Sequence, residues 1–229
     1  MKIIGLIGGM SWESSAEYYR MINEEVKRRL GGLHSAQCIL YSVDFAEIEL
    51  CQSEGNWVKA GEILAVAAKA LENGGADFIV ICTNTMHKVI DAIQRNINIP
   101  ILHIADATAT QIKKHGIKTI GLLGTKYTME QDFYKARLES QGFNILIPDV
   151  LEREMINTII YEELCLGKIL PSSRSSFTRA ISHLIENGAE GIILGCTEIG
   201  LLVKQEDCHV PLFDTTSIHA VATVKKAIE

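Results

Sequence analysis

The sequence has no apolar run that approaches the roughly 20 residues a membrane-spanning helix needs. Its first ten residues are apolar but too short and too rich in glycine for a signal peptide, so we expect neither membrane insertion nor secretion. Basic residues are scattered and outnumbered, with 22 Lys and Arg against 28 Asp and Glu and a net charge of −6. Because nucleic acids and anionic membranes attract concentrated positive charge, we expect neither as a partner.

Motifs for metal and nucleotide binding are missing as well. The six cysteines form no Cys-x-x-Cys pair and no Cys/His spacing typical of zinc sites. Gly5, Gly8 and Gly9 follow the first apolar run without the G-x-G-x-x-G spacing of dinucleotide sites. We therefore expect no metal and no nucleotide cofactor. Without a secretory signal, the thiols are expected to stay reduced in the cytoplasm, where one of them could serve chemistry.

The sequence does contain a regular alternation of short apolar runs and amphipathic stretches. Runs of this length are typical of buried strands in parallel sheets, and we predict strands at Ile3–Ile7, Cys38–Val43, Phe78–Cys82, Ile101–Ile104, Thr119–Leu123, Asn144–Ile147 and Ile192–Leu194. Between them, helices are predicted up to Leu30, at Val58–Asn73 and at Pro171–Asn187. The alternation predicts a doubly wound α/β fold.

The chain also repeats itself. Three pairs of segments match in the same order, each at an offset of 111 to 116 residues: Ile4–Gly8 with Ile120–Gly124, Gly75–Thr83 with Gly188–Cys196, and Ile99–Ile101 with Val210–Leu212. Each match alone would carry little weight, but three at nearly one offset indicate a duplicated half-domain. We therefore predict two pseudo-symmetric, Rossmann-like halves with parallel sheets.

The repeat also locates the expected site. The first half is predicted to comprise residues 1–104 and, through the final helix, 211–229, and the second half residues 105–210. Ligands of open α/β sheets bind outside the carboxyl ends of the strands. Thr83 and Cys196 fall at such ends, at equivalent places in the repeat. We therefore expect the active site in the cleft between the halves.

Cys196 is the first candidate for chemistry, because it stands where a strand gives way to a helix. A thiol at a helix N-terminus is close to positive backbone dipoles, which favour the thiolate and make it a usable base or nucleophile. The alternative is a small buried apolar residue, as free cysteines commonly are. The equivalent turn in the first half, Thr83-Asn84-Thr85, is again polar.

Together these stretches resemble the two signatures of the aspartate/glutamate racemase family. The first signature is Cys-Asn-Thr-x-His, against Thr83–His87 here, and the second is Gly-Cys-Thr-Glu, matched by Gly195–Glu198. The opening Gly5–Ser11 is similar to the family's first strand and substrate loop, and the likeness spans essentially the whole chain. Glu198 stands where the glutamate racemases of peptidoglycan synthesis usually carry His, which indicates the aspartate racemase branch.

The resemblance implies an amino-acid racemase that needs neither pyridoxal phosphate nor metal. In such enzymes a thiolate removes the Cα proton and a thiol on the opposite face returns one. Charge spreads onto the substrate carboxylate, where hydrogen-bond donors act most strongly in the transition state. By family position, that carboxylate would be contacted by Met10, Ser11, Asn84, Thr85 and Thr197. Glu198 would hold the ammonium group, while Asn84 and Thr197 could equally cap helices.

The sequence departs from the family pattern at Thr83, which replaces the first cysteine. A hydroxyl can donate a proton, but its pKa lies far above the roughly 8.5 of a free thiol, so Thr83 cannot be a comparable resting base. Cys82 precedes it by one residue, and on a strand such a step turns the side chain to the other face. We therefore expect Cys82 in the core, Cys196 as the main acid/base and Thr83 as a weak proton donor.

A second departure concerns the substrate side chain. Relatives often place an Arg shortly after the second strand, where this chain offers Gln52. Gln52 can hydrogen-bond a side-chain carboxylate without neutralising it. L-Aspartate, L-glutamate and related small amino acids are therefore all candidate substrates.

Two other functions stay open on the sequence. A single second-half cysteine also matches the arylmalonate decarboxylases, which resemble this superfamily, although an ammonium-binding Glu198 favours amino acids. A non-catalytic amino-acid-binding homologue that lost one base is the other alternative. By analogy with the family, the protein is expected to form a cytoplasmic homodimer.

Overall fold

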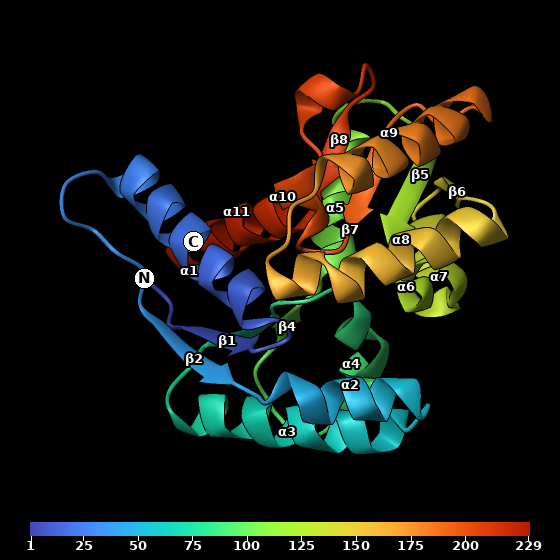
Figure 1. Cartoon of the computed structure of the whole chain (residues 1–229). Helices are drawn as coiled ribbons and strands as arrows, with labels where there is room; N and C mark the ends of the chain where they lie inside the picture. Colours follow the sequence, from blue (N-terminus) through green and yellow to red (C-terminus); the bar gives the residue numbers. More distant parts are fainter. The chain divides into compact units, whose positions relative to one another are not determined.

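The computed structural model describes all 229 residues and divides the chain into two compact units. The first unit comprises Met1–His103 and His219–Glu229, and the second comprises Ile104–Ile218. Figure 1 shows their helices and strands coloured along the sequence. Each unit is an α/β structure with one four-stranded parallel sheet, which confirms the predicted fold class.

The sheet of the first unit has the order β2-β1-β3-β4. Its strands are β1 (Ile4–Gly8), β2 (Cys38–Ser42), β3 (Phe78–Ile81) and β4 (Ile101–Leu102). All neighbours pair in parallel, with Ile4 of the central strand opposite Cys38 on one side and Phe78 on the other. Parallel neighbours place the carboxyl ends of β1 and β3 at the same sheet edge, so the loops that follow these strands lie close together.

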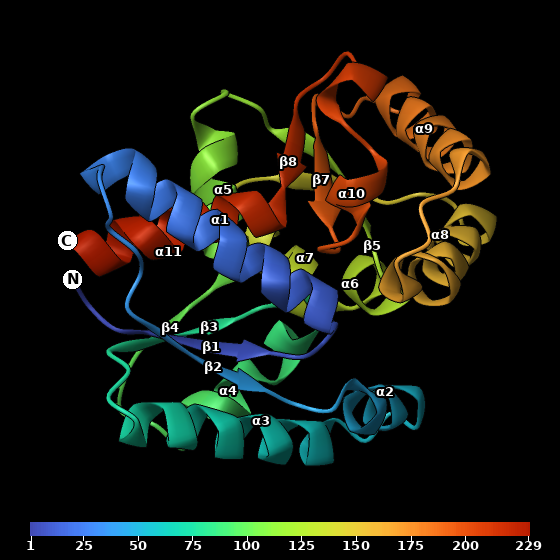
Figure 2. The same cartoon turned by 60° about the vertical axis from the view of Figure 1, so that its left-hand side comes forward.

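Helices cover both faces of this sheet (Figure 2). Leu6 and Val80 point into a cluster with α1 (Trp12–Leu30) and the end of α11 (Thr215–Ile228). Ile7 and Ile81 point to the opposite face, which is covered by α2 (Phe45–Ser53), α3 (Trp57–Asn73) and α4 (Ile90–Gln94). Because successive strand residues face opposite sides, this arrangement explains why the strands are apolar without alternation.

The second unit repeats this topology with the order β6-β5-β7-β8. Its strands are β5 (Thr119–Gly124), β6 (Asn144–Leu146), β7 (Ile192–Gly195) and β8 (Leu212–Asp214). The three sequence matches fall on β1 with β5, β3 with β7, and β4 with β8. The two sheets are thus equivalent strand by strand.

Matching side chains also perform the same structural tasks in the two sheets. Gln94 accepts a hydrogen bond from the Ile101 N–H at 3.2 Å and donates to the Ile99 carbonyl at 3.0 Å. Gln205 makes the equivalent bonds at the start of β8, both at 3.0 Å. Asp77 and Glu190, which are equivalent in the repeat, each accept a backbone N–H at the start of the central strand.

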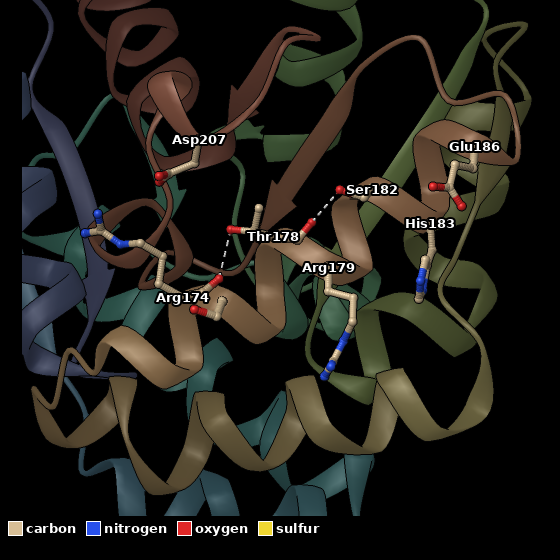
Figure 3. Close-up of a pocket in the computed structure, with 8 residues that line it drawn as sticks. Arg174, Thr178, Arg179, Ser182, His183, Glu186 and Asp207 are labelled. Atoms are coloured by element: carbon tan, nitrogen blue, oxygen red, sulfur yellow. Dashed lines mark hydrogen bonds between the residues drawn. The ribbon is translucent and has the colours of Figure 1, made fainter.

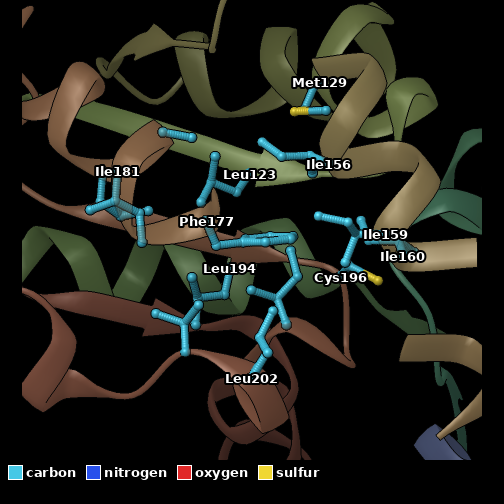
Figure 4. Packing of buried hydrophobic residues seen from close by; sticks show 14 of the residues in the cluster. Leu123, Met129, Ile156, Ile159, Ile160, Phe177, Ile181, Leu194, Cys196 and Leu202 are labelled. Carbon is cyan, nitrogen blue, oxygen red and sulfur yellow. The ribbon is translucent and has the colours of Figure 1, made fainter. Parts of the chain in front are cut away.

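The core of the second unit lies on both faces of its sheet. Phe177 of α9 (Pro171–Glu186) is fully buried against Leu123 and against α8 (Val150–Glu162), as Figure 4 shows. The opposite face is covered by α5 (Ile104–Lys113) and α7 (Asp132–Glu139). The remaining short elements are α6 (Lys126–Glu130), α10 (Ile199–Leu202), and the 3₁₀ turns η1 (Thr85–Val89), η2 (Leu164–Leu166) and η3 (Gln205–Asp207).

The chain passes from the first unit to the second and later returns, and one of these two crossing points differs from the prediction. The first crossing falls between residues 103 and 104, next to the predicted limit of 104. The second falls between 218 and 219, whereas the sequence placed it between 210 and 211. The reason is β8, which pairs with β7 and so belongs to the second sheet. Only the later part of α11, with Ala220 and Val224, packs on the first sheet.

One predicted strand is less buried than expected. β2 was predicted as a buried strand, but its last three residues are exposed. The reason is its place at the edge of the sheet, where β1 is its only partner. A short apolar run does not by itself distinguish a central strand from an edge strand.

Candidate active site

Cys196 stands directly after β7, and Thr197 and Glu198 connect it to α10. Cys196 is 7% exposed and Glu198 3%. Figure 4 shows the Cys196 side chain beside Ile159 and Ile160, at the edge of the apolar core. This cysteine therefore packs against the core and also contacts a charged group.

The Glu198 carboxylate organises this turn. The Cys196 Sγ–H donates to Glu198 Oε2 at 3.1 Å, and the Thr197 hydroxyl donates to the same oxygen at 2.5 Å. Thr197 therefore uses its hydroxyl on a carboxylate rather than to cap α10. A buried thiol with a carboxylate oxygen as hydrogen-bond acceptor has a defined path for losing its proton.

The electrostatics of this turn differ from the sequence-based expectation. Burial raises the pKa of the Cys196 thiol well above its usual value, and the negative charge of Glu198 and the proximity of Cys165 raise it further. The expected lowering by a helix N-terminus is wrong, because α10 has only four residues and therefore sums few peptide dipoles. Burial and the Glu198 charge therefore favour the protonated form of the Cys196 thiol.

Substitution of Glu198 by Gln is expected to lower the pKa of Cys196. The amide oxygen can still accept the thiol hydrogen bond, but the negative charge that disfavours the thiolate is removed. The measurement is the rate of Cys196 alkylation by iodoacetamide against pH, quantified by mass spectrometry of the peptide that contains it. Glu206→Gln, at an exposed position, is the matched control and should leave the curve in place. A Glu198→Gln curve at the wild-type position or at higher pH would contradict this assignment.

In the first unit, the turn after β3 carries Thr83, Asn84 and Thr85. Thr83 is half-buried, whereas Asn84 and Thr85 are buried. Asn84 stands at the N-terminus of η1 but makes no side-chain capping bond, so the capping explanation of this residue is not supported. The Thr83 carbonyl oxygen lies 2.8 Å from Nδ1 of His87.

Cys82 is a core residue, as its position on the strand predicts. Its side chain is 0% exposed and packs with Val80 and Val224 on the α1 face of the sheet. Burial raises its pKa far above that of a free thiol. Cys82 therefore does not replace the missing first-half cysteine.

The loop after β1 brings Met10 and Ser11 to the same edge of the first sheet. Both are buried, and the Ser11 side chain caps α1 by accepting the Ser14 N–H at 3.3 Å. Gly9 is required here, because its φ is +91° and a Cβ would lie 2.2 Å from the Val43 carbonyl oxygen. The tight path sends the chain from β1 directly into α1.

Gln52 of α2 is also brought to this part of the first unit. It is 4% exposed, and its Nε2 donates to Met86 Sδ at 3.1 Å. Met86 follows directly after Thr85, so α2 contacts the turn that carries the predicted carboxylate donors. Each unit thus gathers its own predicted site residues at the carboxyl ends of its strands.

Sequence reasoning missed Ser14, which contacts the backbone just before the turn Thr83-Asn84-Thr85. The Ser14 hydroxyl donates to the Cys82 carbonyl at 3.1 Å, across a separation of 68 residues. No local pattern could predict this contact, because it depends on the packing of α1 beside the end of β3. The structure has no group of three or more His, Cys, Asp or Glu side chains arranged to hold a metal ion.

A surface groove of about 570 Å³ lies in the second unit and is lined mainly by α9. Figure 3 shows the residues that line it. Its charged groups balance, with Arg174 and Arg179 against Glu186 and Asp207. The hydroxyls of Thr178 and Ser182 donate to backbone carbonyls of α9 itself and are committed there. None of the predicted site residues lines this groove, so we assign it no part in the chemistry.

Comparison with known proteins identifies the family of this chain. The model of the Asp/Glu/Hydantoin racemase family matches residues 7–223. A broad specificity amino-acid racemase from Bacillus subtilis is 23% identical over 232 residues, which covers 97% of this chain and 96% of the relative.

Solved structures show the same fold over the full length. A candidate Asp/Glu racemase from Yersinia pestis is 59% identical with a TM-score of 0.93, and an aspartate racemase homologue from Pyrococcus horikoshii OT3 is 40% identical with a TM-score of 0.85. Each likeness covers 100% of both chains. The two-unit α/β architecture is therefore that of a racemase fold. The chain belongs to the Asp/Glu/hydantoin racemase family and is an isomerase.

Proposed function

We propose that this protein racemises a small amino acid, with aspartate and glutamate as the first candidates, by removing and returning the Cα proton. The observation that carries the proposal is the Cys196 thiol held 3.1 Å from a buried carboxylate oxygen of Glu198. The relatives named as amino-acid racemase and aspartate racemase homologue support the substrate class. The proposed reaction uses no pyridoxal phosphate and no metal.

In the proposed mechanism, the substrate itself activates Cys196. The substrate ammonium group binds beside Glu198 and neutralises the charge that raises the pKa of the thiol. The thiol proton passes through Glu198 to water, and the thiolate removes the Cα proton of the L-enantiomer. The electron pair that remains spreads onto the substrate carboxylate, where hydrogen-bond donors stabilise it.

Reprotonation on the opposite face is assigned to Thr83. Its hydroxyl donates a proton to Cα and regains one from water, while the proton taken from the L-enantiomer leaves through Cys196. The proposed contacts of the substrate are made by the side chains or backbone of Met10, Ser11, Asn84, Thr85 and Thr197. Gln52 is proposed to hydrogen-bond the side-chain carboxylate.

Proton NMR in D₂O tests the proposed function directly. With enzyme, the Cα–H signal of L-aspartate or L-glutamate is expected to disappear, even where little net inversion accumulates. An arylmalonate is incubated in parallel, because a site with one thiol also suits a decarboxylase that needs a single proton donor. Loss of carbon dioxide from the malonate without any Cα exchange would replace the racemase proposal. Absence of both reactions would favour a binding protein without catalytic activity.

Two further properties stay predictions. No helix of the structure combines the length and the apolar character needed to cross a bilayer. The cytoplasmic location and the homodimer are proposed by analogy with the family, and size-exclusion chromatography with light scattering tests the dimer.

A further inference from the structure

Three histidines lie buried together in the first unit, although they come from separate segments. His87 lies in η1, His103 follows β4, and His219 lies in α11; they are 1%, 5% and 0% exposed. The ring centroids of His87 and His103 are 4.6 Å apart, and those of His87 and His219 are 6.0 Å apart. Buried imidazoles in contact are a costly arrangement unless their protons are matched to hydrogen-bond partners.

The partners of His219 define its tautomer. Nε2 lies 3.0 Å from the Leu102 carbonyl, which can only accept, so Nε2 carries the proton. Nδ1 is then the acceptor for the Tyr18 hydroxyl at 2.9 Å. Burial and the proximity of His87 lower the pKa of His219 to about 3, so this ring is neutral. His87 therefore packs against a neutral His219 ring whose orientation is held by the Tyr18 hydroxyl and the Leu102 carbonyl.

His87 is defined in the same way. Its Nδ1 lies 2.8 Å from the Thr83 carbonyl oxygen, so Nδ1–H is the donor. The preceding carbonyl, that of Cys82, accepts the Ser14 hydroxyl. The peptide planes on both sides of Thr83 are therefore held by side chains. Because a peptide unit is planar, holding both planes sets the φ and ψ of Thr83 and the direction of its Cα–Cβ bond.

The equivalent turn in the second unit lacks this arrangement. The repeat places Gly200 at the position of His87, and the Cys196 carbonyl accepts the backbone N–H of Ile199 at 3.2 Å. We call the two side-chain hydrogen bonds of Ser14 and His87 to the carbonyls around Thr83 the clamp. The clamp is thus specific to the half in which a threonine replaces the cysteine. A hydroxyl is a weaker proton donor than a thiol because its pKa is far higher.

We propose that His87 is a positioning residue for Thr83: its Nδ1–H holds the Thr83–Asn84 peptide and so aims the Thr83 hydroxyl at Cα during reprotonation. The inference rests on the proposed function, specifically on Thr83 as the proton donor. It separates two activities of the enzyme. Inversion needs Thr83 and therefore His87, whereas exchange of the L-enantiomer's Cα proton needs only Cys196.

The test compares His87→Leu, which removes the donor, with His87→Asn, whose Nδ2 stands close to the position of Nδ1. His87→Leu is expected to lower kcat for inversion by about tenfold or more with little change in KM, because small misplacements of a reacting group are costly. Its L-face exchange should stay within about threefold of wild type, and His87→Asn should recover most of the inversion. An equal fall of exchange and inversion in His87→Leu, or unchanged inversion, would overturn the proposal.

A second measurement does not depend on activity or on folding of a variant. Long-range ¹H–¹⁵N spectra of the wild-type imidazoles report which ring nitrogen carries the proton. We expect Nδ1–H for His87 and Nε2–H for His219. An Nε2–H tautomer at His87 would overturn the positioning role whatever the kinetics show. A wild type with no Cα exchange but an Nδ1–H tautomer would instead overturn the proposed function and leave only the clamp.

Discussion

Replacement of Cys196 by serine is expected to slow Cα–H exchange of the L-substrate by about 10²- to 10⁴-fold, the usual contribution of a positioned acid/base. A serine hydroxyl can occupy the same place and donate to Glu198, but its pKa is too high for it to act as a base of comparable strength. The fold should be intact, since the exchanged atom lies at the edge of the core rather than in its centre. Deuterium incorporation at Cα, followed by NMR at saturating substrate, measures the effect.

Cys82→Ala is the matched control, because it removes the thiol that lies next to Thr83 in the sequence. 

Cys82 stands one residue before the missing first-half base, but its side chain is fully buried on the other face of β3. Cys82→Ala should therefore keep the exchange rate within about twofold of wild type, at a modest cost in stability from the lost packing. An inactive Cys82→Ala beside an active Cys196→Ser would show that the first-half thiol is the base and that the present assignment is wrong.

The second large effect is expected from Thr83, and it begins with an asymmetry in the wild type. In the proposed mechanism, Cys196 removes a proton from the L-enantiomer and can return one to the same face, so L-substrate should exchange with solvent faster than it inverts. Exchange of the D-enantiomer should lag far behind, because it would require an alkoxide at Thr83, and a hydroxyl has a pKa far above that of a thiol. Deuterium incorporation from each enantiomer, alongside chiral chromatography, measures both rates.

Thr83→Cys is expected to raise inversion by about tenfold or more, because a thiol supplies a second usable acid/base. The gain must appear equally in kcat/KM for both directions, since an enzyme cannot shift the equilibrium between enantiomers. Thr83→Ala is the opposite control: it should abolish inversion and leave L-face exchange nearly unchanged. Equal exchange of L- and D-substrate by the wild type, or no gain in Thr83→Cys, would contradict the asymmetric site.

Much of the fold is predictable from the sequence because its signals are local. Apolar runs of strand length separated by amphipathic helices indicate the α/β class, and Gly31 and Pro171 mark a helix end and a helix start as the structure shows them. The repeat places equivalent strands in equivalent positions of the two sheets. The sequence also predicts that Cys82 is buried, since the strand period alone decides which face it takes.

The errors arise where partners in space decide the outcome. β8 belongs to the second sheet because it pairs with β7. The predicted boundary between residues 210 and 211 assigned it to the first half instead, because strand pairing cannot be seen in the sequence. The edge position of β2 leaves residues exposed that the apolar pattern predicted as buried. The pKa of Cys196 depends on burial and on a neighbouring carboxylate, and these outweigh a helix of a single turn.

The sequence by itself therefore determined the fold class, the duplication and the two polar turns, because periodicity and motif spacing are properties of the chain. Tertiary structure alone decided the protonation of Cys196 and the clamp on Thr83. Ser14 and His219 reach their partners across 68 and 117 residues of sequence, respectively. Contacts of that kind depend on how helices pack on a sheet, and burial then sets the charge of the groups they enclose.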